Sequence, residues 1–76
     1  MTQEHIALAE RLKRLGFSHN SQVKLYGQEF LVESGPIVLG GTLAFIDGFE
    51  KKSHLLRRVR IPLPILNVAR GMHRAA

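Results

Sequence analysis

The sequence predicts an α+β fold in which an N-terminal helix precedes a small, strongly bent antiparallel β-sheet or barrel of four or five strands. A short C-terminal helix completes the expected order. Three observations carry this prediction: helical spacing of apolar residues over 3–15, alternation of apolar and polar residues from 21 to 61, and renewed helical spacing after Pro62 and Pro64. The 76 residues are 45% apolar, so we expect a single domain, 1–76, with its own hydrophobic core.

The first helix is expected over residues 3–15. Leu8, Leu12 and Leu15 follow one another at the spacing i, i+4, i+7, which places them on one face of a helix. Gly16 suits the left-handed residue that commonly ends a helix, because glycine has no Cβ to clash. The helix therefore has an apolar face to bury and a defined C-terminal end.

The strands are expected in five segments separated by glycine, proline and polar residues. Their predicted ranges are 22–26, 29–33, 37–39, 42–50 and 55–61. Gly27-Gln28 is the predicted turn between the first two strands. Ser34-Gly35-Pro36 and Gly40-Gly41 are the predicted breaks on either side of the third strand.

The connection between the last two strands has two candidate positions. Asp47-Gly48 is a strong hairpin signal, but a turn there leaves strands of only about five residues. The polar run Lys51–His54 lets two long strands pair, and for that reason we prefer it. Gly48 would then mark a bulge or a close approach of two backbones.

The end of the sequence is expected to close the fold. Pro62 and Pro64 end the last strand, because proline has no N–H for the ladder, and a short helix over 64–71 follows. A sheet of this size covers its apolar face most economically by bending into a small barrel with the first helix over one open end. An SH3-like or Sm-like barrel is the first choice, and an open sheet with one helix packed on it is the second.

A short segment resembles a motif of Sm-like RNA-binding proteins. Gly41-Thr42-Leu43 followed by Asp47 is similar to their Gly-x-Leu…Asp pattern, and the order of helix then barrel also matches. The second Sm signature, an Arg-Gly pair in a late apolar strand, is missing, because Arg70-Gly71 follows two prolines. The resemblance covers fewer than ten residues and implies an RNA-binding barrel without identifying the family.

Positive charge is concentrated in the last third of the sequence. Residues 1–50 contain four Lys or Arg and six Asp or Glu, whereas residues 51–76 contain seven Lys or Arg and no acidic residue. Five of these cations fall within ten positions: Lys51, Lys52, Arg57, Arg58 and Arg60. Such a cluster is typical of a surface that contacts nucleic-acid phosphates and discriminates little among bases.

Three further residues are accessory candidates for this nucleic-acid surface. Lys24 and Tyr26 are expected on the outward face of their strand, and His54 lies in the loop beside the cluster. One feature opposes binding of a single strand, because the basic segment 51–76 has no aromatic residue on which bases could stack. The four phenylalanines are expected in the core: Phe17, Phe30, Phe45 and Phe49.

Two structural interpretations of the same cations stay open. Charged residues on an exposed strand prevent its pairing with other chains. The arginines can instead form cross-strand pairs with carboxylates. The candidate partners are Glu29, Glu33, Glu50 and Asp47.

The sequence contains no signature of an enzyme, a metal site or a cofactor site. Its four histidines lack the spacing of a zinc site, and it has no cysteine. Its serines lack a nucleophile motif. We therefore expect no catalytic residue, no metal and no cofactor. No apolar run approaches the ~18 residues that span a bilayer, so we expect a cytoplasmic protein without membrane contact.

Apolar residues outside the periodic stripes predict self-association. They are Ile6, Leu31, Leu56, Leu63 and Leu66, and the segment 61–66 is the expected centre of an exposed patch. A homo-oligomer, with a dimer as the commonest case, therefore accompanies the binding hypothesis. It also supplies the alternative function, a structural or protein-interaction module with no nucleic-acid role.

Overall fold

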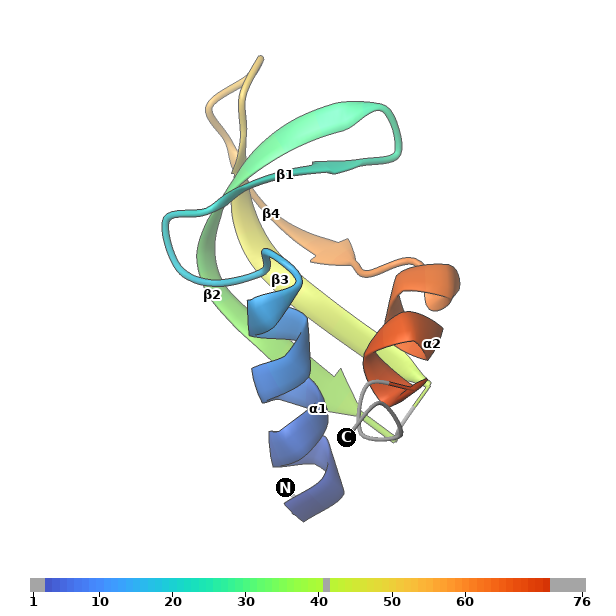
Figure 1. Cartoon of the computed structure of the whole chain (residues 1–76). Helices are drawn as coiled ribbons and strands as arrows, with labels where there is room; N and C mark the ends of the chain where they lie inside the picture. Colours follow the sequence, from blue (N-terminus) through green and yellow to red (C-terminus); the bar gives the residue numbers. More distant parts are fainter. Residues whose placement is uncertain (1–2, 41, 72–76) are drawn as a thin grey trace.

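The computed structural model describes residues 3–40 and 42–71, and its element order agrees with the predicted α+β class (Figure 1). The elements are α1 (Gln3–Arg14), β1 (Gln22–Leu25), β2 (Gln28–Leu39), β3 (Leu43–Glu50), β4 (Leu56–Arg60) and α2 (Leu63–Gly71). The four strands form one antiparallel sheet in the order β1-β2-β3-β4.

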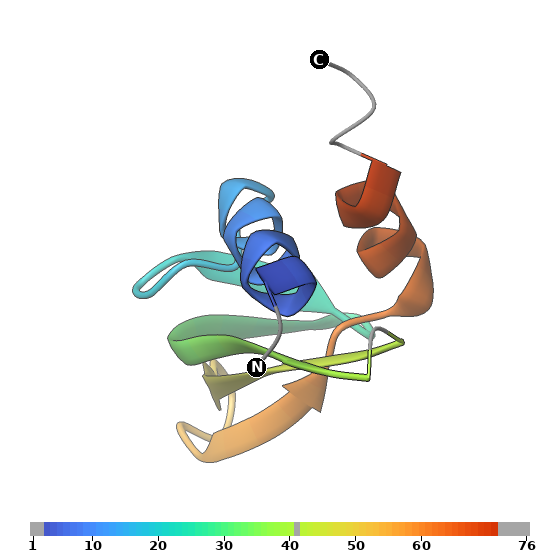
Figure 2. The ribbon, with the colours of Figure 1, turned by 90° about the horizontal axis from the view of Figure 1, so that it is seen from below.

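The sheet is bent but open, so of the two predicted forms the bent antiparallel sheet is correct and the preferred closed barrel is wrong. β1 and β4 form its two edges, and both helices lie on the same side of β2, β3 and β4 (Figure 2). The Tyr26 hydroxyl, in the turn after β1, donates a hydrogen bond of 2.7 Å to the backbone carbonyl of Arg60 at the end of β4. The sheet therefore curves until parts of its two edges meet, while one of its faces is covered by neither α1 nor α2.

The core lies between the two helices and the inner face of the sheet. Leu8 and Leu12 of the predicted stripe are buried, whereas Leu15 follows the last residue of α1 and is 39% exposed. Gly16 has a φ of +111°, and the Phe17 N–H donates to the Leu12 carbonyl, so the predicted helix cap is confirmed. The buried apolar residues are Leu8, Ala9, Leu12, Phe17, Leu25, Phe30, Val32, Val38, Ala44, Ile46, Val59, Ile61, Leu66 and Ala69.

β2 is one strand of twelve residues, although Ser34-Gly35-Pro36 predicted a break between two strands. Its pairing with β3 changes register between Val32 and Ser34 and again between Ser34 and Ile37. Such bulges absorb extra residues while the strand continues. Gly35 makes this arrangement fit, because a Cβ at that position would lie 3.1 Å from the Phe45 carbonyl oxygen on β3.

The loop between β3 and β4 confirms the preferred turn. The chain reverses after Glu50, where the His54 N–H donates to the Glu50 carbonyl, so the connection is the Lys51–His54 loop and not Asp47-Gly48. Gly48 stays within β3, and a Cβ there would lie 3.2 Å from the Leu31 carbonyl oxygen. The expected close approach of two backbones at Gly48 is therefore confirmed.

The turn between β1 and β2 lies one residue earlier than predicted. Tyr26 and Gly27 both have positive φ, and Leu25 pairs with Gln28, which is the pattern of a two-residue hairpin turn. Tyr26 is therefore a turn residue and not the last residue of the strand. β2 ends at Leu39, as the predicted break required, whereas Gly41 lies outside the described residues.

Two predictions about apolar residues are wrong in part. Ile61 and Leu66 are only 1% and 0% exposed, so the segment 61–66 contributes to the core and is not the centre of an exposed patch. The other four of the five apolar residues expected outside the core are exposed, Leu63 among them. Phe45 and Phe49, expected in the core, lie on the opposite face of the sheet, where Phe49 is 37% exposed and Phe45 is half-buried. The other two phenylalanines are in the core as predicted.

Candidate nucleic-acid interface

The five clustered cations lie on the β3–β4 hairpin, but they do not share one face. Arg58 stands opposite Asp47 in the register and Arg60 opposite Phe45, so both arginines face away from the helices. Arg57 alternates to the inner face with the buried Val59, as the sequence predicted. The two lysines, 51 and 52, belong to the loop at the tip, which lies at the opposite end of the molecule from the start of α1 (Figure 1).

Three of these five cations form ion pairs with carboxylates of neighbouring strands. The pairs are Arg58–Asp47, Arg57–Glu50 and Lys51–Glu29, with nitrogen–oxygen distances of 3.0, 3.2 and 3.0 Å respectively. They are the cross-strand pairs that the sequence left open as an alternative to phosphate binding. The three cationic side chains are 57–68% exposed, so water and salt screen each pair, and the pairs add little to stability.

The best-formed of these pairs joins Arg58 to Asp47. Arg58 Nε lies 3.0 Å from Oδ1 and Nη2 lies 3.3 Å from Oδ2, so the guanidinium contacts both carboxylate oxygens. This hydrogen bonding lowers the pKa of Asp47 below its ordinary value, although partial burial opposes the effect, and the Ser34 hydroxyl at 3.1 Å adds to it. The same contact raises the pKa of Arg58. Both groups are therefore charged at neutral pH, and they neutralise each other.

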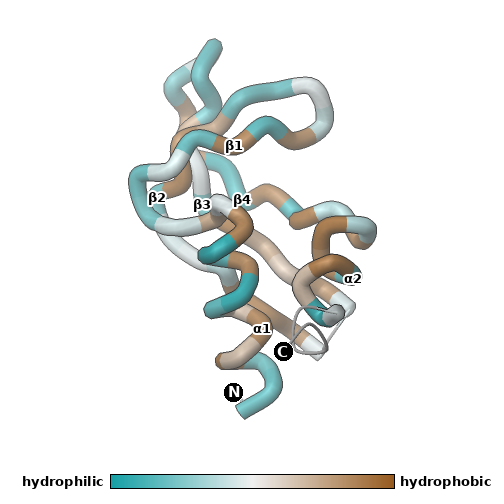
Figure 3. Tube along the Cα trace, viewed as in Figure 1, coloured by the Kyte–Doolittle hydropathy of each residue, from teal (hydrophilic) through white to brown (hydrophobic). Residues whose placement is uncertain are grey.

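Lys52 and Arg60 are the two hairpin cations without an ion pair inside the described ranges 3–40 and 42–71. Arg60 uses its backbone carbonyl to accept the Tyr26 hydrogen bond, while its side chain is exposed. Lys52 belongs to the strongly hydrophilic tip of the hairpin (Figure 3). The hairpin therefore has a local excess of two positive charges after the three pairs are subtracted.

The accessory candidates join the hairpin in different ways. Lys24 stands opposite Glu29 in the register of β1 and β2, and its charge adds to the effect of Lys51 in lowering the Glu29 pKa. Tyr26 is 64% exposed, and its hydroxyl is held by Arg60. His54 is an exposed loop residue with a φ of +60°. The structure thus places Tyr26 in direct contact with Arg60 and links Lys24 to Lys51 through Glu29.

A second surface, which we call the outer apolar face, was predicted only in part, through the exposed Leu31 and Leu56. It consists of seven residues that point away from the helices: Leu31, Ile37, Leu39, Leu43, Phe45, Phe49 and Leu56. The register places Leu31 opposite Phe49 and Phe49 opposite Leu56, so one row of contacts crosses three strands. Four of the seven side chains are 37–54% exposed. Two signals of this surface are present in the sequence. Leu31 and Leu56 lie off the periodic stripes, and residues 43–50 are apolar at both alternating sets of positions.

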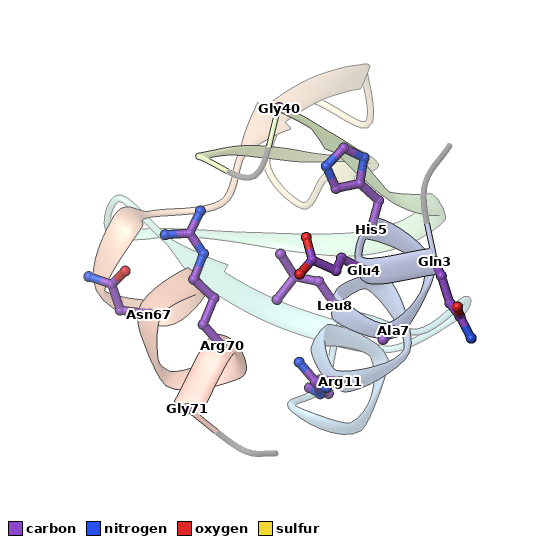
Figure 4. Close-up of a pocket in the computed structure, with 10 residues that line it drawn as sticks. All are labelled: Gln3, Glu4, His5, Ala7, Leu8, Arg11, Gly40, Asn67, Arg70 and Gly71. Atoms are coloured by element: carbon purple, nitrogen blue, oxygen red, sulfur yellow. The ribbon is translucent and has the colours of Figure 1, made fainter. Parts of the chain in front are cut away.

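A groove between α1 and α2 carries charges of both signs (Figure 4). Arg11 and Arg70 line it together with Glu4 and His5, and no cation of the hairpin contributes to it.

Within residues 3–40 and 42–71, no three His, Cys, Asp or Glu side chains are grouped so that they could hold a metal ion. No helix of that part of the chain has the length and apolar character needed to cross a membrane. The candidate surfaces are therefore the hairpin and the outer apolar face.

Comparison of the chain with protein-family models, with curated proteins and with solved structures found no match. The functional argument consequently depends on the charge and the geometry of these two surfaces. The hairpin has the chemistry to bind a polyanion, and the outer apolar face has the chemistry to bind another apolar surface.

Proposed function

We propose that this chain is a small, basic, cytoplasmic binding module that contacts the nucleic-acid backbone through the β3–β4 hairpin, largely without reading the base sequence. The observation that supports it is the group of five cations on one exposed hairpin, of which Lys52 and Arg60 have no ion pair in the described part of the chain. The other three are held only by exposed pairs, which phosphate oxygens can replace. The resemblance of residues 41–47 to the Sm motif stays a prediction, as does the SH3-like or Sm-like character of the fold.

The ion pairs determine how strongly salt should weaken such binding. If only the two unpaired cations contact phosphates of a duplex, the slope of log K against log salt concentration is about −1.8. If phosphates displace all three carboxylates, the slope approaches about −4.5. Fluorescence anisotropy with a labelled 20-mer, as duplex and as single strand, measures this slope between 25 and 200 mM salt. Weak binding that does not change with salt would overturn the proposal.

A pair of double variants tests whether the hairpin is the contact surface. Lys52→Ala with Arg60→Ala removes both unpaired cations, and we expect the salt slope to fall by about two and the binding to weaken uniformly across sequences. The matched control is Lys13→Ala with Arg14→Ala, which removes the same charge from exposed positions at the end of α1. Equal losses in both variants would show that binding follows net charge and does not involve the hairpin.

Releasing a paired arginine provides a test in the opposite direction. Glu50→Gln keeps the shape of the side chain but removes the charge that holds Arg57, so we expect tighter binding and a slope steeper by about one. Glu10→Gln breaks the corresponding pair with Lys13 on α1 and changes the net charge equally. If both variants tighten binding to the same extent, Arg57 does not contact the nucleic acid.

The second candidate function is a structural or protein-interaction module that acts as a homo-oligomer and has no nucleic-acid role. The outer apolar face is the specific observation that favours it, because soluble monomers rarely leave such a surface uncovered. The two functions are separated by the anisotropy experiment: a stable oligomer that binds no oligonucleotide at 25 mM salt supports the second function alone.

A further inference from the structure

We infer that a second copy of this chain covers the outer apolar face, so that the protein forms a dimer in which two sheets pack face to face. The row from Leu31 through Phe49 to Leu56 crosses β2, β3 and β4, and neither α1 nor α2 lies on that side of these strands (Figure 2). Leu39 and Leu56 are 52% and 54% exposed although both belong to regular strands. Packing of two apolar sheet faces is the usual way in which such side chains leave water.

The size of the face sets the strength of the expected dimer. Three strands about 4.8 Å apart and eight residues with a rise of about 3.3 Å give a projected area of roughly 14 Å by 26 Å. The corrugated accessible surface of such a face is larger than its projection, but it remains below the ~800 Å² per partner of a standard interface. We therefore expect a weak, reversible dimer, which forms at the upper end of the concentration range of a sedimentation experiment.

The charges on this side of the sheet are few and mostly paired, so they permit a second copy to approach. Asp47 lies near the middle of β3 on the same face, and Arg58 neutralises it within the same subunit, so the pair can approach another subunit without an unbalanced charge. Arg60 also faces this side, but it is the last residue of β4, where its long side chain can keep the guanidinium in water beside the contact. Most of the exposed apolar side chains there are leucines, which have no ring on which a base can stack.

The edge strand β4 directs the contact to the face of the sheet. Its arginines alternate to both sides, and Pro62 lies two residues after its last residue, two features that oppose pairing of this edge with a strand of another chain. A twofold axis through the face would use the same residues of both copies, as symmetric dimers do. The dimer would present two hairpin tips, each with Lys52, while the two Arg60 side chains stand beside the contact, so the inference is compatible with the proposed nucleic-acid contact.

Sedimentation equilibrium of the whole chain between 5 and 500 µM tests the inference. We expect the wild type to show a monomer–dimer equilibrium, and Leu56→Glu to weaken it at least tenfold because a charge would enter the apolar interface. Leu56→Lys, which adds the opposite charge, should weaken it equally, and far-UV circular dichroism checks that both variants fold. The matched control is Ile6→Glu, which replaces another apolar side chain, 51% exposed, on the helix side of the molecule. Its dissociation constant should remain within twofold of the wild-type value.

Three results would overturn the inference. The first is a wild type that sediments as a monomer at 500 µM. The second is a Leu56→Glu or Leu56→Lys variant that dimerises as well as the wild type, or an Ile6→Glu variant that is impaired as severely. The third is a single-stranded 12-mer that binds the wild type, dissociates the dimer and loses its binding in Leu56→Glu but not in Lys52→Ala. That last result would assign the outer apolar face to nucleic acid.

Discussion

Replacement of Gly35 by alanine tests the close contact between β2 and β3, and Gly16 provides a matched control. Both glycines have a φ of +111°. An alanine in that backbone conformation destabilises the folded state by about 1–3 kcal/mol. At position 35 the new Cβ would also lie 3.1 Å from the Phe45 carbonyl oxygen and 3.2 Å from the Ile46 Cα, whereas nothing lies within 4 Å at position 16. Both contacted atoms belong to the β3 backbone, so relief of the contact requires the strands to separate, at a further ~1–3 kcal/mol.

Urea unfolding followed by far-UV circular dichroism measures the difference between the two variants. A chain of 76 residues has a total stability of about 4–11 kcal/mol, so Gly16→Ala should remain folded while Gly35→Ala approaches the limit of stability. In thermal unfolding the additional loss corresponds to a melting temperature lower by about 4–8 °C per kcal/mol. Equal losses in the two variants would refute the tight β2–β3 approach, and with it the description of β2 as one continuous, bulged strand.

Two further perturbations address the edges and the charges of the sheet. Tyr26→Phe removes the hydrogen bond to the Arg60 carbonyl and should reduce the unfolding free energy by about 0.5–1.5 kcal/mol in the same urea assay. An unchanged urea midpoint would show that the contact does not hold the edges together. For Asp47, the folded-state pKa is lowered, so its stabilising contribution is present above the ordinary pKa of 3.8 and is lost as the pH falls through the folded-state value. We expect the unfolding free energy of Asp47→Asn to lack this part of the decline between pH 5 and pH 2. A variant whose unfolding free energy declines as steeply as that of the wild type would contradict the lowered pKa of Asp47.

Local signals in the sequence were sufficient for the helices and for the main hairpin. The spacing of Leu8 and Leu12 located α1, and Gly16 located its end, because helix caps depend on neighbouring residues only. The choice of the Lys51–His54 loop over Asp47-Gly48 was also correct, since a turn inside β3 would have shortened two strands that pair over five positions. These predictions needed no knowledge of what the elements pack against.

The continuity of β2 could not be predicted from its sequence. Ser34-Gly35-Pro36 has the composition of a break, and only pairing with β3 on both sides keeps the chain extended through it. The turn at Tyr26 was displaced by one residue for a related reason, because tyrosine at a positive φ is unfavourable locally. Its hydroxyl finds the Arg60 carbonyl, 34 positions away, a contact that a local reading of the sequence does not contain.

The distribution of residues between the two faces of the sheet was the most difficult feature to predict. In β3, Phe45 and Phe49 alternate with Ala44 and Ile46, so both faces are apolar and alternation alone does not show which one is buried. The bulk of phenylalanine favoured the core, but the helices cover the face that carries Ala44 and Ile46. Burial by the helices decided the faces, and this depends on tertiary packing.

The same register that exposes the outer apolar face also determines which cations remain for a polyanion. Because β3 and β4 pair with Arg58 opposite Asp47, the hairpin neutralises one of its arginines in the sheet and leaves Arg60 beside the half-buried Phe45. A shift of one residue would move Asp47 and the phenylalanines to the inner face and break the ion pair, so register, charge and the apolar face change together. The two proposed surfaces are thus consequences of one pairing. Lys52, in the loop beyond the strands, is the hairpin cation least affected by it, and its substitution is therefore the most direct probe of the polyanion contact alone.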